Sequence, residues 1–301
     1  MKKVHFAKGH GTENDFVILP DPDGLIDLTG DLVARLCDRR AGLGADGVLR
    51  AMRATGEPAV AGLSAAADGG AEWFMDYRNA DGSLAEMCGN GIRVFVRYLI
   101  GHGLVAGPEF AVGTRAGTRL VRAEPDGTIT VDMGPPQLLG AGRAVLAGRP
   151  LDGLRVSLGN PHLACVVDEP LDSFDLSRPP VLDAGQFPEG GNLELVRLTG
   201  DGHAQMLVYE RGSGPTRSCG TGAVAAAVAA ARSAAATASG LTGTWIVDLP
   251  GGRLRVTLNR QTSFLSGPAV IVAEGELDQA WLSGTALSGT ALTPAQSSPA
   301  A

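Results

Sequence analysis

The stretch NADGSLAEMCGNGIR at residues 79–93 is repeated in outline by ERGSGPTRSCGTG at residues 210–222. Each stretch begins with Asn or Glu, reaches a cysteine nine positions later, and continues with glycine, a polar residue and glycine. The chain has four cysteines among its 301 residues. Because two of these rare residues share one local setting, we expect Cys88 and Cys219 to act as a pair.

Other landmarks recur at a similar offset along the chain. Cys88-Gly-Asn-Gly returns as Cys219-Gly-Thr-Gly, Gly117-Thr-Arg-Leu120 as Gly251-Gly-Arg-Leu254, and Gly134-Pro-Pro as Gly267-Pro-Ala, at offsets of 131, 134 and 133 residues. Three landmarks in the same order at a nearly constant offset predict two similar halves. We expect the halves to meet near Asp132, where TITVDMGPP ends a strand with glycine and proline.

Each half is expected to run through strands, the cysteine-bearing turn, an apolar helix and a hairpin. The helices are predicted at 91–99 (GIRVFVRYL) and at 222–239 (GAVAAAVAAARSAAATAS). The second helix is so rich in alanine that we expect it to be buried against close neighbours. Residues 119–133 (RLVRAEPDGTITVDM) predict two strands around a Pro-Asp-Gly turn.

The composition excludes several classes of partner. With 25 basic and 32 acidic residues the net charge is −7, and no lysine–arginine cluster stands out, so we expect neither nucleic acid nor an anionic membrane as a partner. No stretch has the roughly 20 uninterrupted apolar residues of a membrane span. Four widely spaced cysteines without a CxxC motif indicate neither a zinc site nor a disulfide framework, which favours a reducing cytoplasm.

The scarcity of lysine limits the chemistry that the chain can perform. The lysines are Lys2, Lys3 and Lys8, so a Schiff base with pyridoxal phosphate has almost no candidate, and we expect neither a cofactor nor a metal. A GxGxxG match at 42–47 follows a helix-like segment and precedes a strand-like one. This order is the reverse of a dinucleotide fingerprint, so we predict no nucleotide site there.

The glycine turns after the two cysteines suggest what the pair does. The first N–H groups of a helix lack internal partners and favour a carboxylate ligand, and glycine lets that ligand approach the backbone. The same field is expected to lower the cysteine pKa from about 8.5 toward physiological pH. Two facing turns would hold one carboxylate between a sulfur on each face of the adjacent carbon. One thiolate would remove the proton and the opposite thiol would deliver another, which predicts stereoinversion without a cofactor.

These motifs resemble those of the diaminopimelate epimerase family. Besides the two cysteine stretches, GTENDF, GNPH, GGNLELV and VDLPGGRL match the family in order and spacing, over positions 2–277. The resemblance implies an α+β fold of two pseudo-symmetric domains, each a curved mixed β-sheet or barrel wrapped around a central α-helix. It also implies interconversion of LL- and meso-2,6-diaminopimelate in lysine and cell-wall precursor biosynthesis, without a cofactor.

The resemblance implies a set of site residues as well. Cys88 and Cys219 match the catalytic pair, and His162 and Glu210 match residues that tune the thiol pKa values. The residues implied in substrate binding are Asn14, Asn79, Gly89, Asn90, Asn160, Asn192, Glu210, Arg211, Gly220 and Thr221. Taken singly, His162 reads as a solvated turn residue, Asn14 and Asn79 as turn formers, and Glu210 with Arg211 as a surface ion pair. Their joint occurrence in family order favours the site.

One position departs from the family pattern. Many relatives have GADQ or GFDQ, with a glutamine that contacts the substrate, where this chain has Gly44-Ala-Asp-Gly47. Glycine offers only its backbone N–H. We therefore expect the distal end of the substrate to be held in another way.

Other functions remain open from the sequence. A proline racemase or hydroxyproline epimerase would use the same cysteine pair on a ring substrate, although Arg211 and the asparagines favour a long substrate with two polar ends. An isomerase like that of phenazine biosynthesis shares the implied architecture but lacks the cysteine pair. A redox-sensing protein would use the two thiols as a regulatory disulfide and would not exchange a substrate proton with solvent.

The predicted organisation has two halves and a tail. We assign residues 1–132 together with 268–277 to the first half and 133–267 to the second. An Ala/Gly-rich loop from about residue 53 to 71 looks dispensable, and 278–301 is expected to be a disordered tail. The sequence does not decide the oligomeric state, for which a homodimer is one option.

Overall fold

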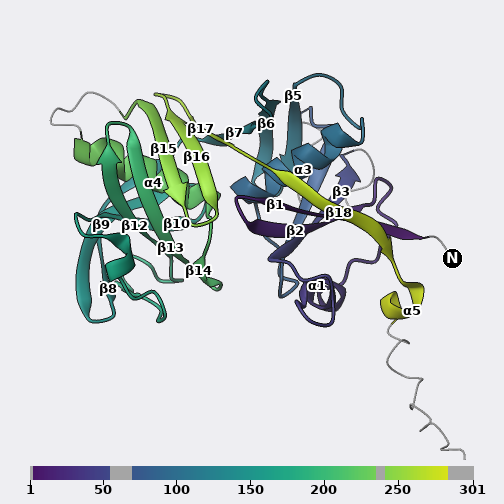
Figure 1. The fold of residues 1–301 in the computed structure, drawn as a ribbon, viewed down its shortest axis with the longest axis horizontal. Coiled ribbons are helices and arrows are strands. Elements are labelled where there is room, and N and C mark those ends of the chain that lie inside the picture. Colours follow the sequence, from purple (N-terminus) through teal and green to yellow (C-terminus); the bar gives the residue numbers. More distant parts are fainter. Residues whose placement is uncertain (1–2, 55–69, 235–240, 284–301) are drawn as a thin grey trace, which may run out of the picture.

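The computed structural model describes residues 3–54, 70–234 and 241–283. Within these ranges the chain forms two lobes, each with strands curved around one long helix (Figure 1). The helix of the first lobe is α3 (Gly89–Gly101) and that of the second is α4 (Gly220–Ala234). The expected α+β architecture of two similar halves is confirmed.

The first lobe combines the N-terminal strands with the last strand of the chain. Its strands are β1 (Val4–Gly11), β2 (Asn14–Pro20), β3 (Gly47–Arg53), β4 (Trp73–Asn79), β5 (Glu109–Thr114), β6 (Gly117–Ala123), β7 (Ile129–Gly134) and β18 (Val270–Leu277). They pair in the order β18-β1-β2-β3-β4-β5-β6-β7, with β2–β3 and β4–β5 parallel and the others antiparallel. Helix α1 (Gly30–Cys37) connects β2 to β3, and α3 connects β4 to β5.

The second lobe contains the middle of the chain. Its strands are β8 (Gln137–Leu146), β9 (Arg149–Ser157), β10 (Pro161–Val166), β11 (Val181–Leu182), β12 (Asn192–Gly200), β13 (His203–Glu210), β14 (Gly214–Thr216), β15 (Gly243–Leu249), β16 (Gly252–Leu258) and β17 (Ser263–Gly267). The main order is β8-β9-β10-β12-β13-β15-β16-β17, with β10–β12 and β13–β15 parallel. The short helix η1 (Leu171–Ser173) also belongs to this lobe, whereas the short helix α5 (Gln279–Leu282) follows β18 and lies at the first lobe near α1 (Figure 1).

The two lobes repeat one pairing pattern. The first lobe is counted from β18 and the second from β8. In both, the third and fifth pairs of neighbouring strands are parallel and the other pairs are antiparallel. Each long helix lies in the connection between the strands of the second parallel pair. The landmark glycines Gly134 and Gly267 end equivalent strands, β7 and β17. These two strands also pair with each other and join the lobes. The duplication predicted from the sequence is confirmed.

Helix α4 lies at the centre of the second lobe because its side chains are small. Residues Gly220 to Ala230 are all buried, and strands β9, β10, β12, β13, β15 and β16 contact the helix. A helix that is apolar on every side is typical of a fully enclosed position. Alanine and glycine let the surrounding strands approach closely, as the alanine-rich sequence predicts.

Both long helices begin two residues earlier than predicted. Their first turns are the Gly-polar-Gly segments themselves, starting at Gly89 and Gly220. Helix α4 is described as far as Ala234, and the rest of its predicted length lies outside the described residues. The hairpin predicted at 119–133 is confirmed as β6 and β7, and the GxGxxG match lies between α1 and β3 as expected.

The predicted tail is ordered at its start. The side chain of Asp278 accepts a hydrogen bond from the Trp281 N–H at 2.9 Å and caps α5. Trp281 donates its indole N–H to the Ala41 carbonyl and stacks 4.6 Å from the Arg35 guanidinium. This tryptophan holds the start of the tail against α1 and the segment that follows it. Residues 55–69 of the predicted loop and 284–301 of the tail lie outside the described residues.

Candidate active site

Cys88 and Cys219 occupy equivalent positions at the starts of the two central helices. Cys88 is the N-cap of α3, and its sulfur accepts a hydrogen bond from the Gly91 N–H at 3.4 Å. Cys219 directly precedes α4, and its sulfur accepts from the Gly222 N–H at 3.3 Å. In both cases the thiol satisfies one of the N–H groups that a helix start leaves without an internal partner. The two predicted catalytic residues are therefore positioned by the same local geometry.

The starts of α3 and α4 meet at two glycines. A Cβ atom placed on Gly220 would lie 3.0 Å from the Cα of Gly89, and one on Gly89 would lie 3.3 Å from the Cα of Gly220. The side chain of Leu265 closes the same space from β17. Only glycine allows this backbone approach. Because each helix start carries partial positive charge, the junction is suited to an anion.

Two asparagines surround the Cys88 thiol. The side-chain oxygen Oδ1 of Asn14 lies 3.6 Å from the Cys88 sulfur and accepts a hydrogen bond from Asn90 Nδ2 at 3.2 Å. Asn90 also donates to the carbonyl and the hydroxyl of Ser218, each at 3.2 Å. Since Ser218 belongs to the second lobe, the fully buried Asn90 amide ties the lobes together at the site.

A buried arginine lies behind the first helix start and was not singled out from the sequence. Arg93 is 0% exposed and donates to the Gly89 carbonyl at 2.8 Å, the Thr12 hydroxyl at 3.2 Å and the Pro268 carbonyl at 3.4 Å. Among the described residues no carboxylate forms an ion pair with it. Burial lowers the pKa of Arg93 to about 10, and electrostatic attraction to Cys88 opposes that shift. The sequence does contain a signal for a buried Arg93, because this charged residue lies inside the apolar run GIRVFVRYL.

Cys219 has a more acidic environment than Cys88. Its sulfur lies 3.5 Å from the Thr221 hydroxyl, which accepts a hydrogen bond from Asn160 Nδ2 at 3.3 Å. Burial raises the pKa of Cys219 well above its ordinary value, and the carboxylates of Glu210 and Glu194 add to the increase. Burial also raises the pKa of Glu210, while hydrogen bonds from Thr216 and Cys219 oppose that shift. Glu210 thus lies within reach of the Cys219 proton.

His162 is completely enclosed, which corrects the simpler expectation of a solvated turn histidine. Its Nδ1 lies 2.6 Å from Oε1 of Glu194, and its Nε2 lies 3.1 Å from Oδ1 of Asn160. His162 and Glu194 are both 0% exposed. Glu194 was missed in the sequence because GNLELV reads as an ordinary strand. Its signal was its place two residues after Asn192, where alternation puts both side chains on one face.

The structure does not connect every predicted residue to the cysteines. Asn79 Nδ2 donates to Ser83 Oγ at 3.0 Å within a turn, and the Arg211 guanidinium, 43% exposed, reaches the Glu189 carbonyl at 3.3 Å. Within the described ranges neither side chain hydrogen-bonds another member of the predicted set. The Arg211 backbone N–H does so, donating to Asn192 Oδ1 at 2.9 Å. The Arg211 guanidinium also lies 3.9 Å from Glu189 Oε2, and its partial exposure leaves it accessible to a ligand.

The structure gives a steric reason for glycine, rather than a residue with a side chain, at position 47. A Cβ atom there would lie 2.6 Å from the Arg78 carbonyl oxygen and 2.8 Å from Cε2 of the Tyr77 ring. Tyr77 packs edge-on against Phe16 with ring centroids 5.9 Å apart. The ring of Tyr77 thus occupies the space that a glutamine side chain at position 47 would need.

The expected lowering of the thiol pKa is contradicted by the burial of both cysteines, which raises their pKa values. Removal from water raises the pKa of Cys88 to about 11, while the hydrogen bond from the Gly91 N–H acts in the opposite direction. The physical reason is that burial destabilises a thiolate more than one backbone N–H stabilises it. Both thiols are therefore protonated near neutral pH before a ligand binds.

We expect the rate of alkylation of Cys88 by iodoacetamide to rise about tenfold for each pH unit between about pH 7 and pH 10, because only the thiolate reacts. Cys88 keeps partial exposure, so it should react before the other three thiols. The measurement is the initial rate by peptide mass mapping, with glutathione as the control, whose rate levels off near its own pKa. A Cys88 rate that levels off below about pH 9 would contradict the raised pKa.

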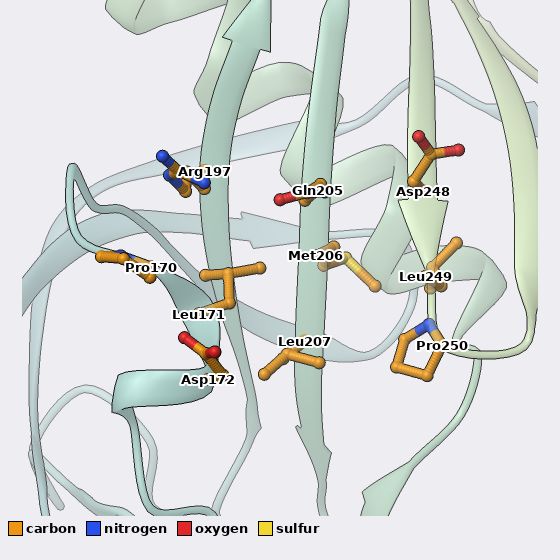
Figure 2. Close-up of a pocket in the computed structure, with 10 residues that line it drawn as sticks. All are labelled: Pro170, Leu171, Asp172, Arg197, Gln205, Met206, Leu207, Asp248, Leu249 and Pro250. Atoms are coloured by element: carbon orange, nitrogen blue, oxygen red, sulfur yellow. The ribbon is translucent and has the colours of Figure 1, made fainter.

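A surface pocket in the second lobe lies apart from this site. It has a volume of about 450 Å³ and is formed by η1 and residues of β12, β13 and β15 (Figure 2). Its charged side chains are Asp172, Arg197 and Asp248. It contains none of the predicted site residues and no cysteine, so the paired helix starts remain the candidate active site.

Comparison with known proteins agrees with this geometry. The family model described as "Diaminopimelate epimerase" matches residues 6–139 and 154–272. A diaminopimelate epimerase of Thermobifida fusca is 60% identical over 276 residues, which cover 91% of this chain and 98% of that protein. The chain belongs to the diaminopimelate epimerase family. Both cysteine-bearing turns lie within the matched residues.

Solved structures extend the likeness beyond the diaminopimelate epimerase family. A phenazine biosynthesis protein of the PhzF family from Bacillus anthracis has a TM-score of 0.65 at 17% identity, covering 92% of this chain and 100% of that one. A hydroxyproline epimerase from Agrobacterium vitis has a TM-score of 0.63 at 12% identity, covering 91% and 92%. At these identities the likeness shows a shared fold.

Neither a membrane-spanning helix nor a metal-binding cluster occurs among the described residues. In the described part of the chain, no helix combines the length and apolar character needed to cross a membrane. Over the same residues, no three His, Cys, Asp or Glu side chains are grouped so that they could hold a metal ion.

Proposed function

We propose that the chain interconverts LL- and meso-2,6-diaminopimelate through Cys88 and Cys219, without a cofactor. The observation that carries the proposal is the pair of cysteine-capped helix starts in contact at Gly89 and Gly220. Membership in the diaminopimelate epimerase family supports the choice of substrate. The same evidence supports a role in the biosynthesis of lysine and cell-wall precursors.

The substrate carboxylate next to the reacting carbon would bind at the helix junction. The backbone N–H groups of Gly89-Asn90 and Gly220-Thr221 belong to the two helix starts, which meet at Gly89 and Gly220. They would stabilise the negative charge that spreads onto the carboxylate when the α-proton leaves. Asn14 contacts the Cys88 thiol and Asn160 contacts Thr221 beside Cys219, and their amide groups would bind the α-ammonium and carboxylate.

The proton transfer needs one thiolate and one thiol. We infer that Glu210 takes the proton of Cys219, with which it shares a hydrogen bond, when the substrate ammonium group brings positive charge into the site. The Cys219 thiolate then removes the α-proton from one face, and the Cys88 thiol gives its proton to the other face. The reverse reaction exchanges the two roles. Arg93 behind α3 would stabilise the thiolate left on Cys88.

The decisive experiment is incubation with LL-diaminopimelate in deuterated water. The α-hydrogen should exchange for deuterium while the meso isomer forms, as followed by NMR. Neither EDTA nor hydroxylamine should change the rate. Proline and alanine serve as comparison substrates, and efficient racemisation of proline would move the assignment to the proline racemases. If none of these amino acids exchanged its α-hydrogen, the result would favour the redox-sensing alternative.

Arg211 is proposed to hold the distal carboxylate. Its guanidinium is partly exposed and can bind a carboxylate through two parallel hydrogen bonds. We expect Arg211→Lys to lower kcat/KM for diaminopimelate roughly tenfold, because an ammonium group cannot reproduce the two-pronged contact. The measurement is steady-state kinetics. Arg143→Lys, at an exposed arginine of β8, is the control and should behave like the wild type.

The remaining assignments follow from the same reasoning. We propose that the first half comprises residues 1–132 and 268–277 and the second 133–267, which is consistent with the pairing of β18 with β1. The scarcity and spacing of cysteines support a cytoplasmic location. A homodimer is proposed as the form to test by light scattering.

A further inference from the structure

The strands around α4 contain a histidine–carboxyl pair that has no access to water. His162 lies on β10 and Glu194 on β12, and Nδ1 and Oε1 are 2.6 Å apart. The parallel register places His162 opposite Asn192, so Asn192 and Glu194 project from the same face of β12. That face is covered by α4, because a Cβ on Gly222 would lie 2.8 Å from Glu194 Oε1 and 3.2 Å from Cys219 Sγ.

The hydrogen-bond partners assign two protons to this pair. His162 Nε2 lies 3.1 Å from the amide oxygen of Asn160, which can only accept, so Nε2 carries a hydrogen. A second proton lies between Nδ1 and Oε1 of Glu194. Asn192 Nδ2 also approaches Nδ1, at 3.4 Å, and this longer contact is the weaker one. The pair is therefore neutral overall, with its Nε2–H directed at Asn160.

The chain of hydrogen bonds continues from Asn160 to the thiol. Because the oxygen of Asn160 accepts from His162, its Nδ2 is turned toward α4 and donates to the Thr221 hydroxyl at 3.3 Å. That hydroxyl lies 3.5 Å from the Cys219 sulfur. Glu194, His162, Asn160, Thr221 and Cys219 thus form one continuous sequence of contacts from the core to the start of α4.

The His162–Glu194 pair is poorly suited to stabilising the core of the second lobe. Oε2 of Glu194 is buried and has no hydrogen-bond partner in the described part of the protein. Buried pairs with an unsatisfied oxygen often contribute less than apolar side chains of the same size. Because the pair lies close to Cys219, we attribute its presence to a role at the active site.

We propose that Glu194 is a positioning residue for the epimerisation, a role that rests on the proposed function. By holding a proton at Nδ1, it keeps the His162 ring in the form that donates from Nε2. This bond fixes the orientation of Asn160, which in turn places Thr221 and the Cys219 thiol for proton transfer. Without Glu194 the ring can exchange tautomers, and Asn160 can turn its amide.

The test compares Glu194→Leu with Glu194→Gln. Leucine removes the partner of Nδ1, and we expect kcat/KM for LL-diaminopimelate to fall roughly tenfold, as is usual for residues that orient active-site ligands. Glutamine can donate to Nδ1 and keep the hydrogen on Nε2, so it should retain most of the activity. Wild-type activity in Glu194→Leu, or an equal loss in both variants, would overturn the positioning role.

A double-mutant cycle and a spectroscopic signal complete the test. In an Asn160→Ala background, Glu194→Leu should cause little further loss, because it acts through Asn160; full additivity would refute this. Nitrogen-15 NMR of the wild-type protein, with His162→Gln for assignment, should show Nε2 protonated. An Nε2 without a proton would refute the assignment even if a variant failed to fold.

The control uses the other histidine–carboxylate pair of the second lobe. His203 Nε2 lies 2.7 Å from Asp248 Oδ2, and both side chains are partly exposed. Asp248→Asn should leave kcat/KM unchanged. Wild-type turnover of LL-diaminopimelate tests the proposed function separately, since an active wild type with an unaffected Glu194→Leu variant would reject only the role of Glu194.

Discussion

Replacing Cys88 or Cys219 by alanine is expected to reduce epimerisation of diaminopimelate by a factor of about 10³ or more, because one face of the α-carbon then has no proton carrier. The fold should survive, since Cys88 is only partly buried and alanine retains the Cβ of the buried Cys219. Serine should be nearly as poor, because its hydroxyl is far less acidic than a thiol. The measurement is the rate of meso product formation, with circular dichroism as the check on folding.

The two other cysteines provide the control for this prediction. Cys37 and Cys165 are buried in separate apolar clusters, and burial raises their pKa values to about 11 and about 12. Neither belongs to the helix junction. Cys37→Ala and Cys165→Ala should keep normal turnover apart from modest packing losses. Near-normal activity in Cys88→Ala or Cys219→Ala would end the two-thiol mechanism.

Gly220→Ala is expected to lower kcat/KM by about 10- to 100-fold, because separating the two helix starts by even a few tenths of an ångström moves both thiols relative to the reacting carbon, and a misplacement of about 1 Å can cost about 100-fold. The new Cβ would lie 3.0 Å from the Cα of Gly89 and 3.1 Å from its carbonyl carbon. These neighbours are backbone atoms and cannot rotate away. We also expect overpacking to lower the free energy of unfolding by about 1–3 kcal/mol, measured by urea denaturation.

The matched control is a glycine at the other end of the first helix. A Cβ on Gly101, the last residue of α3, meets no atom within 4 Å, and its backbone does not have a positive φ. Gly101→Ala should therefore retain full activity and gain up to about 1 kcal/mol of stability. If Gly220→Ala were as active as Gly101→Ala, contact between the helix starts would not matter for catalysis.

Much of this arrangement could be predicted from the sequence because it is repeated. The Cys-Gly-polar-Gly turns, the strand-ending Gly134 and Gly267 and the alanine-rich run each carry a local signal, and their common offset relates one half to the other. The repeat predicted the two cysteine-capped helices and their equivalence. The resemblance implied site roles for His162 and Asn160, and in the structure these two residues are linked through Thr221 to Cys219.

The features that were missed depend on contacts between distant segments. Glu194 and Arg93 sit in apolar runs, and nothing local shows that Glu194 pairs with His162 or that Arg93 has no carboxylate partner among the described residues. The direction of the thiol pKa shift was wrong because it depends on how much water the folded chain excludes, whereas the sequence shows only the helix start. Tyr77 filling the space beside Gly47 is likewise a tertiary effect.

The junction of α3 and α4 has a thermodynamic consequence for the whole protein. Two helix starts carry like partial charges and are held in contact at Gly89 and Gly220, so they repel each other. The carboxylate that we propose to bind there would cancel this repulsion and attract both helices at once. Ligand binding and folding are therefore linked by mass action, and a cell that supplies the substrate also stabilises the enzyme that consumes it.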